Sequence, residues 1–463
     1  MPERDGAADP RKGRAIEQLE ALEEKMPGLA ARRAALDILM LLRKGRTLDN
    51  AFSDCRTFSV LEGPDRSFAF NLVNTTLRRR GSLDQLIGEY LNKPLPKGAM
   101  EVQDILRLAA TQAAFLETPA HAIAATSAEL AGQKRETAGY KGLVNAIARK
   151  IAGRGKAQIE KLPLRADTPG WLWRSWERYY GATTAREIAA AHLAGVAPLD
   201  ISLKPEADPD LFAGFENVSS FTPSHRRLPP NHAVPSLPGF NQGNWWVQDF
   251  ASSLPVTMLG EVSGKQVLDL CAAPGGKTMQ LAALGAQVTA VDNIGTRLKR
   301  VTENLARTKL SAETLKADIL EWQPEALVDA VLLDAPCSAT GTIRRHPDVV
   351  WNRTEDEVRT LARQQGTFID RALEFLKPGG LLVYCVCSLQ REEGEDQVRA
   401  ALSRHQGLEL VPLTREELTA LPEAVTREGY LRTHPAMRVP EGSMDGFFAA
   451  RLRKPSAPAA GDN

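Results

Sequence analysis

Long apolar runs are missing from this sequence of 463 residues. No stretch of 18 consecutive apolar residues occurs, so no segment is predicted to cross a membrane. The charged N-terminal stretch also has no apolar core of the kind that secretory signals carry. We therefore expect a cytoplasmic protein, with residues 1–26 and 454–463 as disordered ends.

Cysteine is scarce, with five residues in the chain, and that number is odd. A sparse, odd set argues against a disulfide framework and favours a reducing compartment. No CxxC pair and no matching histidine spacing occurs, so we expect no metal site. Three of the cysteines fall inside the motifs described below, which indicates chemistry. The five are Cys55, Cys271, Cys337, Cys385 and Cys387.

Neither sign of charge dominates, since the formal net charge is +1, but the charges are unevenly distributed. Residues 1–165 hold 27 Lys and Arg against 20 Asp and Glu, a net charge of +7. A polyanion is therefore expected to bind mostly through the first third. A solvated surface explains any single basic residue, but the set indicates phosphate binding. The set comprises Arg78, Arg79, Arg80, Lys134, Arg135, Lys141, Arg149, Lys150, Arg154 and Lys156.

Three patterns divide the chain. Over residues 27–160, apolar positions recur every three or four residues between Gly, Pro and capping residues, which predicts an all-α bundle. Residues 161–245 carry three Trp and a Pro-rich connection, which indicates a small adaptor domain. Over residues 246–453, strands and helices alternate up to a hairpin-like pair of strands. This alternation predicts a doubly wound, Rossmann-like α/β domain with ligands at the carboxyl ends of its strands.

The strongest local motif is VLDLCAAPGGKT, residues 267–278, an apolar strand followed by a small-residue turn and a helix. Small residues let a ligand approach the backbone, and the helix start offers free N–H groups to an anion. A Walker A loop would need Gly in place of Cys271, and GxGxxG is absent, so neither nucleotide loop fits. The candidate cofactor-binding residues are Cys271, Ala272, Ala273, Pro274, Gly275, Gly276 and Lys277.

Aspartates end the next three predicted strands. Asp292 ends the second strand, where an acid can bind the ribose hydroxyls of an adenosine cofactor. Asp318 and Asp334 end the third and fourth. A single strand-end Asp is more often a cap or turn former. Three in register beside the small-residue loop favour a shared cofactor site.

Two cysteines follow neighbouring strand ends, in LLDAPCSATGTIRRHPD and in LVYCVCS. Carbon 5 of cytosine is a poor nucleophile. A thiolate that adds at carbon 6 makes carbon 5 enamine-like, so that it can attack a sulfonium methyl group. Hydrogen bonding at N3, for which Asp334 is the candidate, assists the addition. A second thiol, from the pair Cys337 and Cys387, can then assist release.

Simpler interpretations remain for several of these residues. A lone buried Cys is usually an apolar filler, which we prefer for Cys55 and Cys385. Cys385 and Cys387 are two apart on a strand and share a face, so only one is needed. For Cys337 the filler interpretation is weak, because it follows Asp-Ala-Pro at a strand end where ligands bind. An amino-group methyltransferase would be expected to carry an aromatic there, so a Cys favours attack on a ring carbon. Residues 344–346, Arg-Arg-His, fit RNA contact and structural ion pairing equally.

At this point LCAAPGGKT, VDNIGTRLKR, LLDAPCSATGTIRRHPD and YCVCS together resemble a known family. It is the Sun/Fmu (RsmB-type) family of bacterial 16S rRNA cytosine-C5 methyltransferases, part of the Nop2/Sun group. VQDFASSL and DGFFAARL are similar to further family segments, so the resemblance covers most of the chain. DRSFAFNLVNTTLRRRGSLDQLI and LVNAIARKI are similar, more loosely, to a NusB-like RNA-binding domain.

The resemblance implies a multidomain fold: a NusB-like bundle, an adaptor and a class I methyltransferase domain. It implies Cys387 as nucleophile, Cys337 as the releasing residue, and S-adenosylmethionine bound by residues 271–277, Asp292, Asp318 and Asp334. The implied partner is rRNA before the ribosome is fully assembled, and we expect a monomer.

The sequence departs from the family pattern at three places. The first is Ala339, which replaces a usual Gly, and the second is Val386, which replaces a usual Thr and has an added thiol, Cys385, beside it; the third lies in the adaptor. The stretch LDISLKP lacks an Asn expected near the RNA-contacting strand. None of these changes removes a catalytic group, but the last leaves the target nucleotide open.

Two other functions are also compatible with the sequence. A DNA cytosine-C5 methyltransferase would use the proline-linked Cys337 as nucleophile and would not need Cys387. A non-catalytic ribosome-assembly factor would keep the fold as an RNA-binding scaffold, but the intact Cys337, Cys387 and Asp334 count against it.

Overall fold

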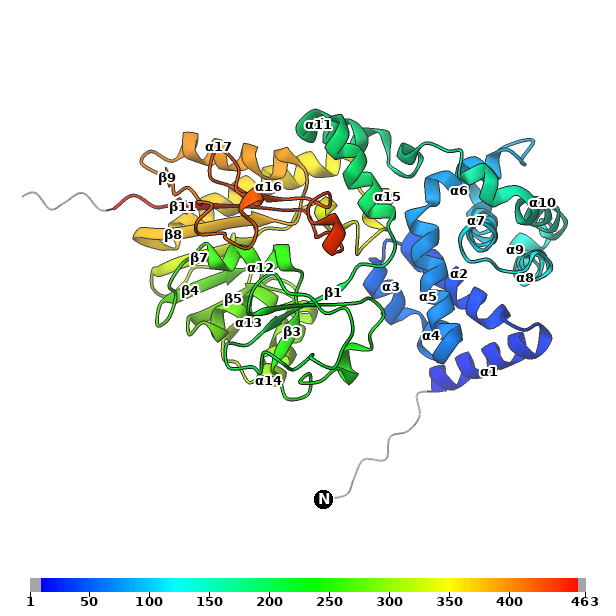
Figure 1. The fold of residues 1–463 in the computed structure, drawn as a ribbon, viewed down its shortest axis with the longest axis horizontal. Helices are drawn as coiled ribbons and strands as arrows, with labels where there is room; N and C mark the ends of the chain where they lie inside the picture. The colour runs from blue at the N-terminus through cyan, green and yellow to red at the C-terminus, as the bar shows by residue number, and fades with distance from the viewer. Residues whose placement is uncertain (1–9, 457–463) are drawn as a thin grey trace, which may run out of the picture. The chain divides into compact units, whose positions relative to one another are not determined.

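Figure 1 shows the computed structural model of the chain, which describes residues 10–456. The described residues form two compact units. We call residues 10–169 with 346–351 the helical unit, and residues 170–345 with 352–456 the sheet unit. The predicted adaptor region, 161–245, is split between them, because its first nine residues group with the helices and the rest with the sheet.

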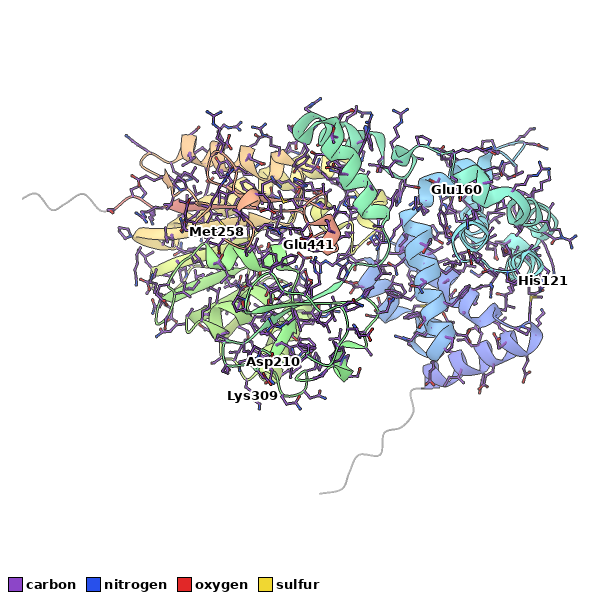
Figure 2. All side chains as sticks on the ribbon, viewed as in Figure 1. His121, Glu160, Asp210, Met258, Lys309 and Glu441 are labelled. Atoms are coloured by element: carbon purple, nitrogen blue, oxygen red, sulfur yellow. The ribbon has the colours of Figure 1, made fainter. Side chains whose placement is uncertain are left out.

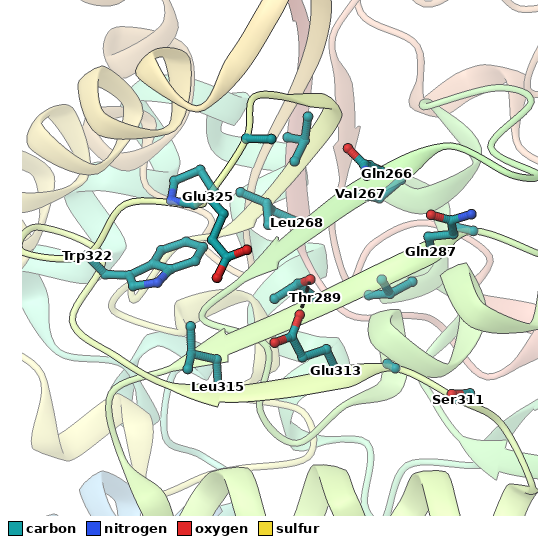
Figure 3. Close-up of a pocket in the computed structure, with 16 residues that line it drawn as sticks. Gln266, Val267, Leu268, Gln287, Thr289, Ser311, Glu313, Leu315, Trp322 and Glu325 are labelled. Atoms are coloured by element: carbon teal, nitrogen blue, oxygen red, sulfur yellow. Dashed lines mark hydrogen bonds between the residues drawn. The ribbon is translucent and has the colours of Figure 1, made fainter.

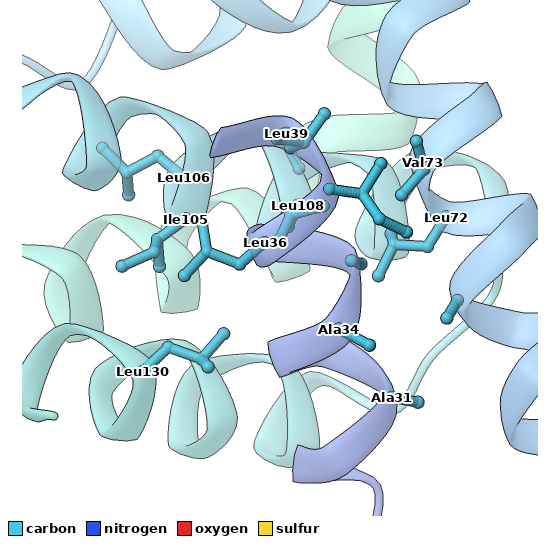
Figure 4. Packing of buried hydrophobic residues seen from close by; sticks show 14 of the residues in the cluster. Ala31, Ala34, Leu36, Leu39, Leu72, Val73, Ile105, Leu106, Leu108 and Leu130 are labelled. Carbon is cyan, nitrogen blue, oxygen red and sulfur yellow. The ribbon is translucent and has the colours of Figure 1, made fainter. Parts of the chain in front are cut away.

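The helical unit is a bundle around one apolar core, as the three- and four-residue periodicity predicted. Leu36, Leu72, Leu83 and Ile105 are fully buried in this core, part of which Figure 4 shows. The helices are α1 (Pro10–Lys25), α2 (Leu29–Arg43), α3 (Leu48–Asp54), α4 (Arg56–Ser59), α5 (Gly63–Arg78), α6 (Arg80–Gly88), α7 (Met100–Phe115), α8 (Ala120–Gly132), α9 (Arg135–Ala138) and α10 (Lys141–Ile159).

The expectation that residues 1–26 are disordered is wrong for α1, while residues 1–9 lie outside the described part of the chain. Ala15 and Leu19 are buried and Leu22 packs against the bundle core. These residues lie three or four apart, so they form one face of a helix. Their burial against the core outweighs the high charge of the segment, which had suggested disorder.

A short segment, His346–Trp351, belongs to the helical unit although its sequence follows the Cys337 motif. The Leu48 amide donates to Asp348 Oδ2 at 3.2 Å, and Trp351 Nε1 donates to the Leu77 carbonyl at 2.9 Å. The ring of Trp351 also lies 5.3 Å from the guanidinium of Arg80. These contacts explain why the segment groups with helices distant in sequence.

The main sheet of the sheet unit has the strand order β10-β11-β8-β7-β4-β5-β6, with β9 paired to β11. The strands from β6 to β8 in this order are mutually parallel, whereas β11 is antiparallel to β8 and β10 to β11. The predicted α/β alternation and terminal hairpin are therefore confirmed. The strands are β4 (Gln266–Leu270), β5 (Gln287–Asp292), β6 (Glu313–Lys316), β7 (Val328–Asp334), β8 (Leu376–Val386), β9 (Glu409–Leu410), β10 (Leu431–Thr433) and β11 (Phe447–Arg453).

Helices cover both faces of this sheet, because alternate residues of each strand point to opposite sides. Val383 and Cys385 of β8 join a core with α12 (Phe250–Thr257) and α13 (Gly276–Ala283). Leu382, Tyr384 and Val386 join the other, with α16 (Glu355–Glu374) and α17 (Glu395–Arg404). A further helix of this unit is α14 (Gly295–Thr308), whose C-cap is Lys309, labelled in Figure 2. The short α15 (Val349–Asn352) has its first three residues in the helical unit.

A second sheet of three antiparallel strands precedes the main sheet in sequence. Its strands are β1 (Leu199–Leu203), β2 (His225–Leu228) and β3 (Trp245–Val247), in the order β2-β1-β3. The 24-residue helix α11 (Gly170–Leu193), kinked at Gly181, comes before it. None of the helices within residues 10–456 combines the length and the apolar character needed to cross a membrane.

Candidate active site

The small-residue loop joins β4 to α13, as the motif predicted. Cys271 and Gly275 have positive φ values of 62° and 102°. The Gly275 amide donates to the Ala272 carbonyl at 2.9 Å, which closes the turn. A Cβ atom on Gly275 would lie 3.1 Å from a methyl group of Val301, so a side chain there would have to push against α14. Glycine therefore fits this position on two counts.

Asp292 ends β5 and lies beside the loop. Its side chain is buried, and Oδ2 accepts from the Ala273 amide at 3.3 Å while Oδ1 accepts from the Ile294 amide at 2.9 Å. Arg297 donates to the Ala273 carbonyl at 2.8 Å. Asp292 thus lies next to the candidate cofactor residues, as expected, and also holds their backbone.

Asp269 is a site residue that the sequence motifs did not single out. It is fully buried on β4, and Oδ2 accepts from the Thr278 hydroxyl at 2.5 Å. Oδ1 has no hydrogen-bond partner among the described residues. Burial raises the pKa of this carboxyl to about 7. A charged residue inside the otherwise apolar strand VLDL was the available signal, because a buried acid needs a partner.

Asp318 is less closely tied to the site than the sequence suggested. The strand β6 ends at Lys316, so Asp318 lies two residues beyond it. Its side chain is exposed and accepts from the Leu320 amide at 2.9 Å. This geometry is that of a turn-forming aspartate. A role in binding cofactor stays a prediction for this residue.

A buried ion pair links the small-residue loop to β7. Lys277 Nζ lies 2.8 Å from Asp334 Oδ2, and the lysine side chain is only 10% exposed. Burial alone would lower the pKa of Lys277, but the nearby Asp334 carboxylate outweighs it and the net shift is upward. Lys277 is therefore held as a cation beside the end of β7, next to Phe447, whose ring centroid lies 4.9 Å from Nζ.

The two motif cysteines meet just beyond the ends of β7 and β8. Their Sγ atoms are 3.4 Å apart, and both residues are half-buried. The parallel register explains the meeting, because Asp334 of β7 lies opposite Cys385 of β8. The hydrogen bond with Cys387, followed by burial, raises the pKa of the Cys337 thiol. The two thiols therefore lie close together, as the positions of their motifs indicated.

The other cysteines have the environments expected of fillers. Cys55 is buried in the helical unit, and Cys385 is fully buried in the sheet unit. Burial, with a smaller contribution from Asp334, raises the pKa of the Cys385 thiol. Cys385 Sγ nevertheless lies 3.8 Å from Asp334 Oδ1, so this thiol contacts the back of the site.

The loop after Cys337 shows why glycine would suit position 339. Ala339 has φ 58°, in the left-handed region. The next tight point is Gly341, where a Cβ atom would lie 1.9 Å from the Gly446 carbonyl oxygen. Val386, the other departure, is fully buried among apolar neighbours, so its side chain serves packing.

We expect Ala339→Gly to stabilise the sheet unit by about 1 kcal/mol, because a left-handed conformation costs an alanine about 1–2 kcal/mol that glycine does not incur. Urea unfolding followed by tryptophan fluorescence measures the change. Ala335→Gly is the matched control: Ala335 is buried without a positive φ, so glycine there should destabilise. A lower unfolding midpoint for Ala339→Gly would contradict the strain assigned to this loop.

Arg344 and Arg345 both form ion pairs, which favours the structural of the two interpretations given for residues 344–346. Arg344 is 3% exposed and lies 3.1 Å from Asp249, the N-cap of α12. Arg345 pairs with Asp445 through Nε at 2.7 Å. Burial, followed by the charge of Asp445, raises the pKa of Asp249 to about 6. The segment after Cys337 is therefore anchored through buried charges.

The densest basic run, Arg78 to Arg80, is also not a free cationic surface. Arg78 is buried, the Arg79 guanidinium lies 3.8 Å from Asp167, and burial lowers the pKa of Arg80. Lys134 pairs with Glu101 at 2.8 Å. The remaining residues of the basic set are exposed; they are Arg135, Lys141, Arg149, Lys150, Arg154 and Lys156.

A hollow of about 760 Å³ lies elsewhere in the sheet unit, along the first residues of β4 and β5 and along β6. Figure 3 shows Leu268, Thr289, Leu315 and Trp322 around it. None of the predicted catalytic or cofactor residues lines this hollow. The candidate site is therefore identified by the chemistry of its side chains and not by the volume of a cavity. No cluster of side chains suited to a metal ion occurs within residues 10–456.

Comparison with known proteins adds two family matches. Residues 256–453 match the family model described as 16S rRNA methyltransferase RsmB/F, and residues 29–153 match the NusB family model. The chain is 33% identical over 439 residues to ribosomal RNA small subunit methyltransferase B of Serratia proteamaculans, covering 91% of this chain and 97% of that protein. The protein of that name in Pseudomonas putida is 32% identical over 447 residues, covering 93% and 99%.

Solved structures share the fold. The crystal structure of PH0851 covers 93% of this chain and 99% of its own, with a TM-score of 0.74 and 23% identity. NSun6 from Pyrococcus horikoshii, solved with SFG, covers 62% of this chain and 99% of its own, with a TM-score of 0.52 and 20% identity. At these identities the likeness establishes the architecture.

Proposed function

Since the chain belongs to the RsmB/F family of S-adenosylmethionine-dependent rRNA methyltransferases, we propose that it methylates carbon 5 of a cytosine in 16S rRNA through a covalent cysteine adduct. The observation that supports this chemistry best is the pair of Sγ atoms 3.4 Å apart, one after each of two parallel strands. The names of the relatives support the choice of small-subunit rRNA as substrate.

The residues around the loop fit the cofactor that the family uses. Asp269 leaves one buried acceptor oxygen without a partner, and the loop from Cys271 to Lys277 excludes side-chain bulk at Gly275. We assign cofactor binding to residues 271–277, Asp292 and Asp334, and retain Asp318 as a weaker candidate. When bound, S-adenosylmethionine supplies the methyl group. The residues of this chain position the cytosine and take part in its proton transfers.

In the proposed reaction, the Cys387 thiolate adds to carbon 6 of the cytosine, which makes carbon 5 nucleophilic. As the sulfur adds, N3 takes up the proton that the Cys387 thiol gave up, the Asp334 carboxylate accepts a hydrogen bond from this N3–H, and Lys277 neutralises the carboxylate. After methylation, water takes the carbon-5 proton, the double bond between carbons 5 and 6 re-forms as the bond from Cys387 Sγ to carbon 6 breaks, and the N3 proton returns to the departing thiolate. Cys337 assists this expulsion, since its Sγ lies against the departing sulfur.

The experiment that tests the function uses in vitro transcribed 16S rRNA carrying [5-³H]cytosine. Methylation at carbon 5 displaces the tritium, so release should equal methyl incorporation. A transcript with [6-³H]cytosine is the control and should keep its label. Methylation without tritium release would contradict carbon 5 as the target. Tritium release from a DNA duplex but not from the transcript would favour the DNA enzyme. The absence of release from both substrates would favour the assembly factor.

RNA binding through α10 leads to a prediction about salt dependence. Lys150 and Arg154 are exposed and one helical turn apart. We expect the double variant Lys150→Glu, Arg154→Glu to bind 16S rRNA more weakly. The slope of log affinity against log salt should fall by about 1 to 2, because the variant neutralises fewer phosphates and so releases fewer counterions. Filter binding over a salt series measures both quantities.

Lys265→Glu is the control for this substitution. Lys265 is exposed and directly precedes β4, so it lies at the amino ends of the parallel strands rather than at their carboxyl ends. Reversing the charge of Lys265 should leave the slope of log affinity against log salt unchanged. An equal fall in slope in both variants would mean that net charge, not α10, governs RNA binding. Surface substitutions are preferable to truncation, because residues 346–351 depend on the helices for their contacts.

A further inference from the structure

The residues that follow the two cysteines are bonded to one buried carboxylate. Ser388 Oγ donates to Glu393 Oε2 at 2.5 Å, and Ser338 Oγ donates to the same oxygen at 2.5 Å. The Ser338 amide donates to Glu393 Oε1 at 2.8 Å. Glu393, Ser338 and Ser388 are all fully buried. One carboxylate therefore holds the loop after Cys337 and the loop after Cys387 at the same time.

Further polar groups complete this cluster. Gln365, fully buried on α16, donates to Glu393 Oε1 at 3.1 Å and to the Pro336 carbonyl at 2.9 Å. Thr340 Oγ1 lies 3.2 Å from Ser388 Oγ and accepts from the Leu389 amide at 3.0 Å. The cluster thus reaches the residue before Cys337 and the second residue after Cys387.

The carboxylate itself is fixed in place. Glu393 ends a short 3₁₀ helix, Arg391–Glu393, and its backbone carbonyl accepts from the Tyr384 hydroxyl at 2.5 Å. Tyr384 lies in the middle of the buried part of β8, so the anchor of Glu393 belongs to the sheet. The strand that leads into Cys387 therefore also positions the group that bonds the loop after Cys337.

The hydrogen bonds to Glu393 hold the two cysteine loops in place, so this residue does more than fill space. Four donors converge on Glu393, which is the pattern of an ionised carboxylate, since that form only accepts. Charge-assisted hydrogen bonds are shorter and stronger than neutral ones. Without the carboxylate, several buried donors would lose their acceptor, and the loops would have to move to satisfy them. The sulfurs, each one residue from a held serine, would move with them.

We propose that Glu393 is a positioning residue that sets the two thiols, Cys337 and Cys387, at reacting distance. This inference rests on the proposed function, because it assigns Glu393 to the addition and release steps of that reaction. Glu393 touches neither the cytosine nor the cofactor-binding loop in this role. Its negative charge adds to the effects of the Cys387 hydrogen bond and burial that raise the pKa of Cys337, which favours a neutral thiol there.

The test uses 16S rRNA transcribed with 5-fluorocytidine, on which the adduct persists because fluorine cannot leave as a proton. Glu393→Gln keeps the size but turns one acceptor into a donor that faces other donors. We expect the rate of adduct formation to fall at least tenfold, with affinities for S-adenosylmethionine and RNA changed less than twofold. Calorimetry and filter binding measure those affinities. A merely structural role would instead lower cofactor binding in step with activity.

Two smaller substitutions keep the test open if Glu393→Gln folds poorly. Ser388→Ala removes the donor next to the nucleophile and should slow adduct formation. Ser338→Ala removes a donor next to Cys337 and should instead prolong the adduct on ordinary cytidine RNA. Glu392→Gln is the matched control, because this neighbouring acid accepts from the Tyr179 hydroxyl at 3.1 Å and should leave every rate unchanged.

The outcomes distinguish the role of Glu393 from the proposed function. Adduct formation at the wild-type rate in Glu393→Gln would overturn the role of Glu393 alone. Identical behaviour of Ser338→Ala and Ser388→Ala would overturn the assignment of each serine to its neighbouring thiol. Wild-type protein that forms no adduct and releases no tritium would overturn the proposed function, and the role of Glu393 with it.

Discussion

Replacing Cys387 by alanine is expected to abolish methyl transfer and leave no covalent complex with RNA, whereas Cys337→Ala is expected to trap that complex. The loss in Cys387→Ala should reach about 10³-fold or more, the order of effect expected when a covalent nucleophile is removed. In Cys337→Ala the adduct should form and accept the methyl group but stall before the thiolate leaves. Turnover should then stop near one methyl group per enzyme.

The opposite outcomes follow from the order of the steps. Loss of a residue that is needed for addition prevents the adduct from forming. Loss of a residue that is needed only after methyl transfer lets the adduct accumulate. The structure makes both roles possible, since each thiol is half-buried and the Sγ atoms are 3.4 Å apart. Denaturing gel electrophoresis of enzyme with radiolabelled 16S rRNA measures the trapped species directly.

Cys385→Ala is the matched control for both variants. This thiol is two residues from the nucleophile but is fully buried, so its removal should leave the adduct and the turnover intact. If Cys337→Ala prevents the adduct and Cys387→Ala traps it, the roles are reversed and the arrangement of a DNA enzyme applies. Unchanged activity in both variants would rule out the covalent mechanism.

Asp334→Asn is expected to lower the rate constant of methyl transfer by about 100-fold or more, because the buried Lys277 loses its counter-charge and the base loses its partner at N3. RNA affinity, which the phosphate contacts dominate, should change little. Single-turnover methylation with excess enzyme measures the rate constant. Asp329→Asn is the control, since Asp329 is the second residue of the same strand and pairs with Lys377 at 2.6 Å, at the end away from the site.

A double-mutant cycle sharpens the second prediction. Lys277→Met removes the cation while keeping a long apolar stem. If the pair acts as a unit, the combined effect of Asp334→Asn and Lys277→Met should fall short of the sum by roughly 1–3 kcal/mol, as for contacting residues in one network. Additive effects would mean that Asp334 acts on the base independently of Lys277.

Much of the fold was predictable because its signals are local. The alternation of strands and helices, the small-residue turn at Gly275 and the terminal hairpin each follow from patterns within a few residues. The same reasoning placed Cys337 and Cys387 together, because parallel strands bring their carboxyl ends to one edge. Residues 10–25 were missed, because high charge masked the spacing of Ala15, Leu19 and Leu22.

The sequence by itself determined the family and the order of the elements, and it predicted which residues carry the chemistry, because motif spacing and periodicity depend only on near neighbours. Only the tertiary structure decided which charges are free. Arg344 is buried against Asp249, 95 residues away, and Arg79 lies beside Asp167, so these arginines serve the fold. Glu393 likewise gained its place between the two thiol loops only from folding, since Ser338 lies 55 residues away in sequence. Burial and pairing of charge depend on such distant partners, which no local pattern contains.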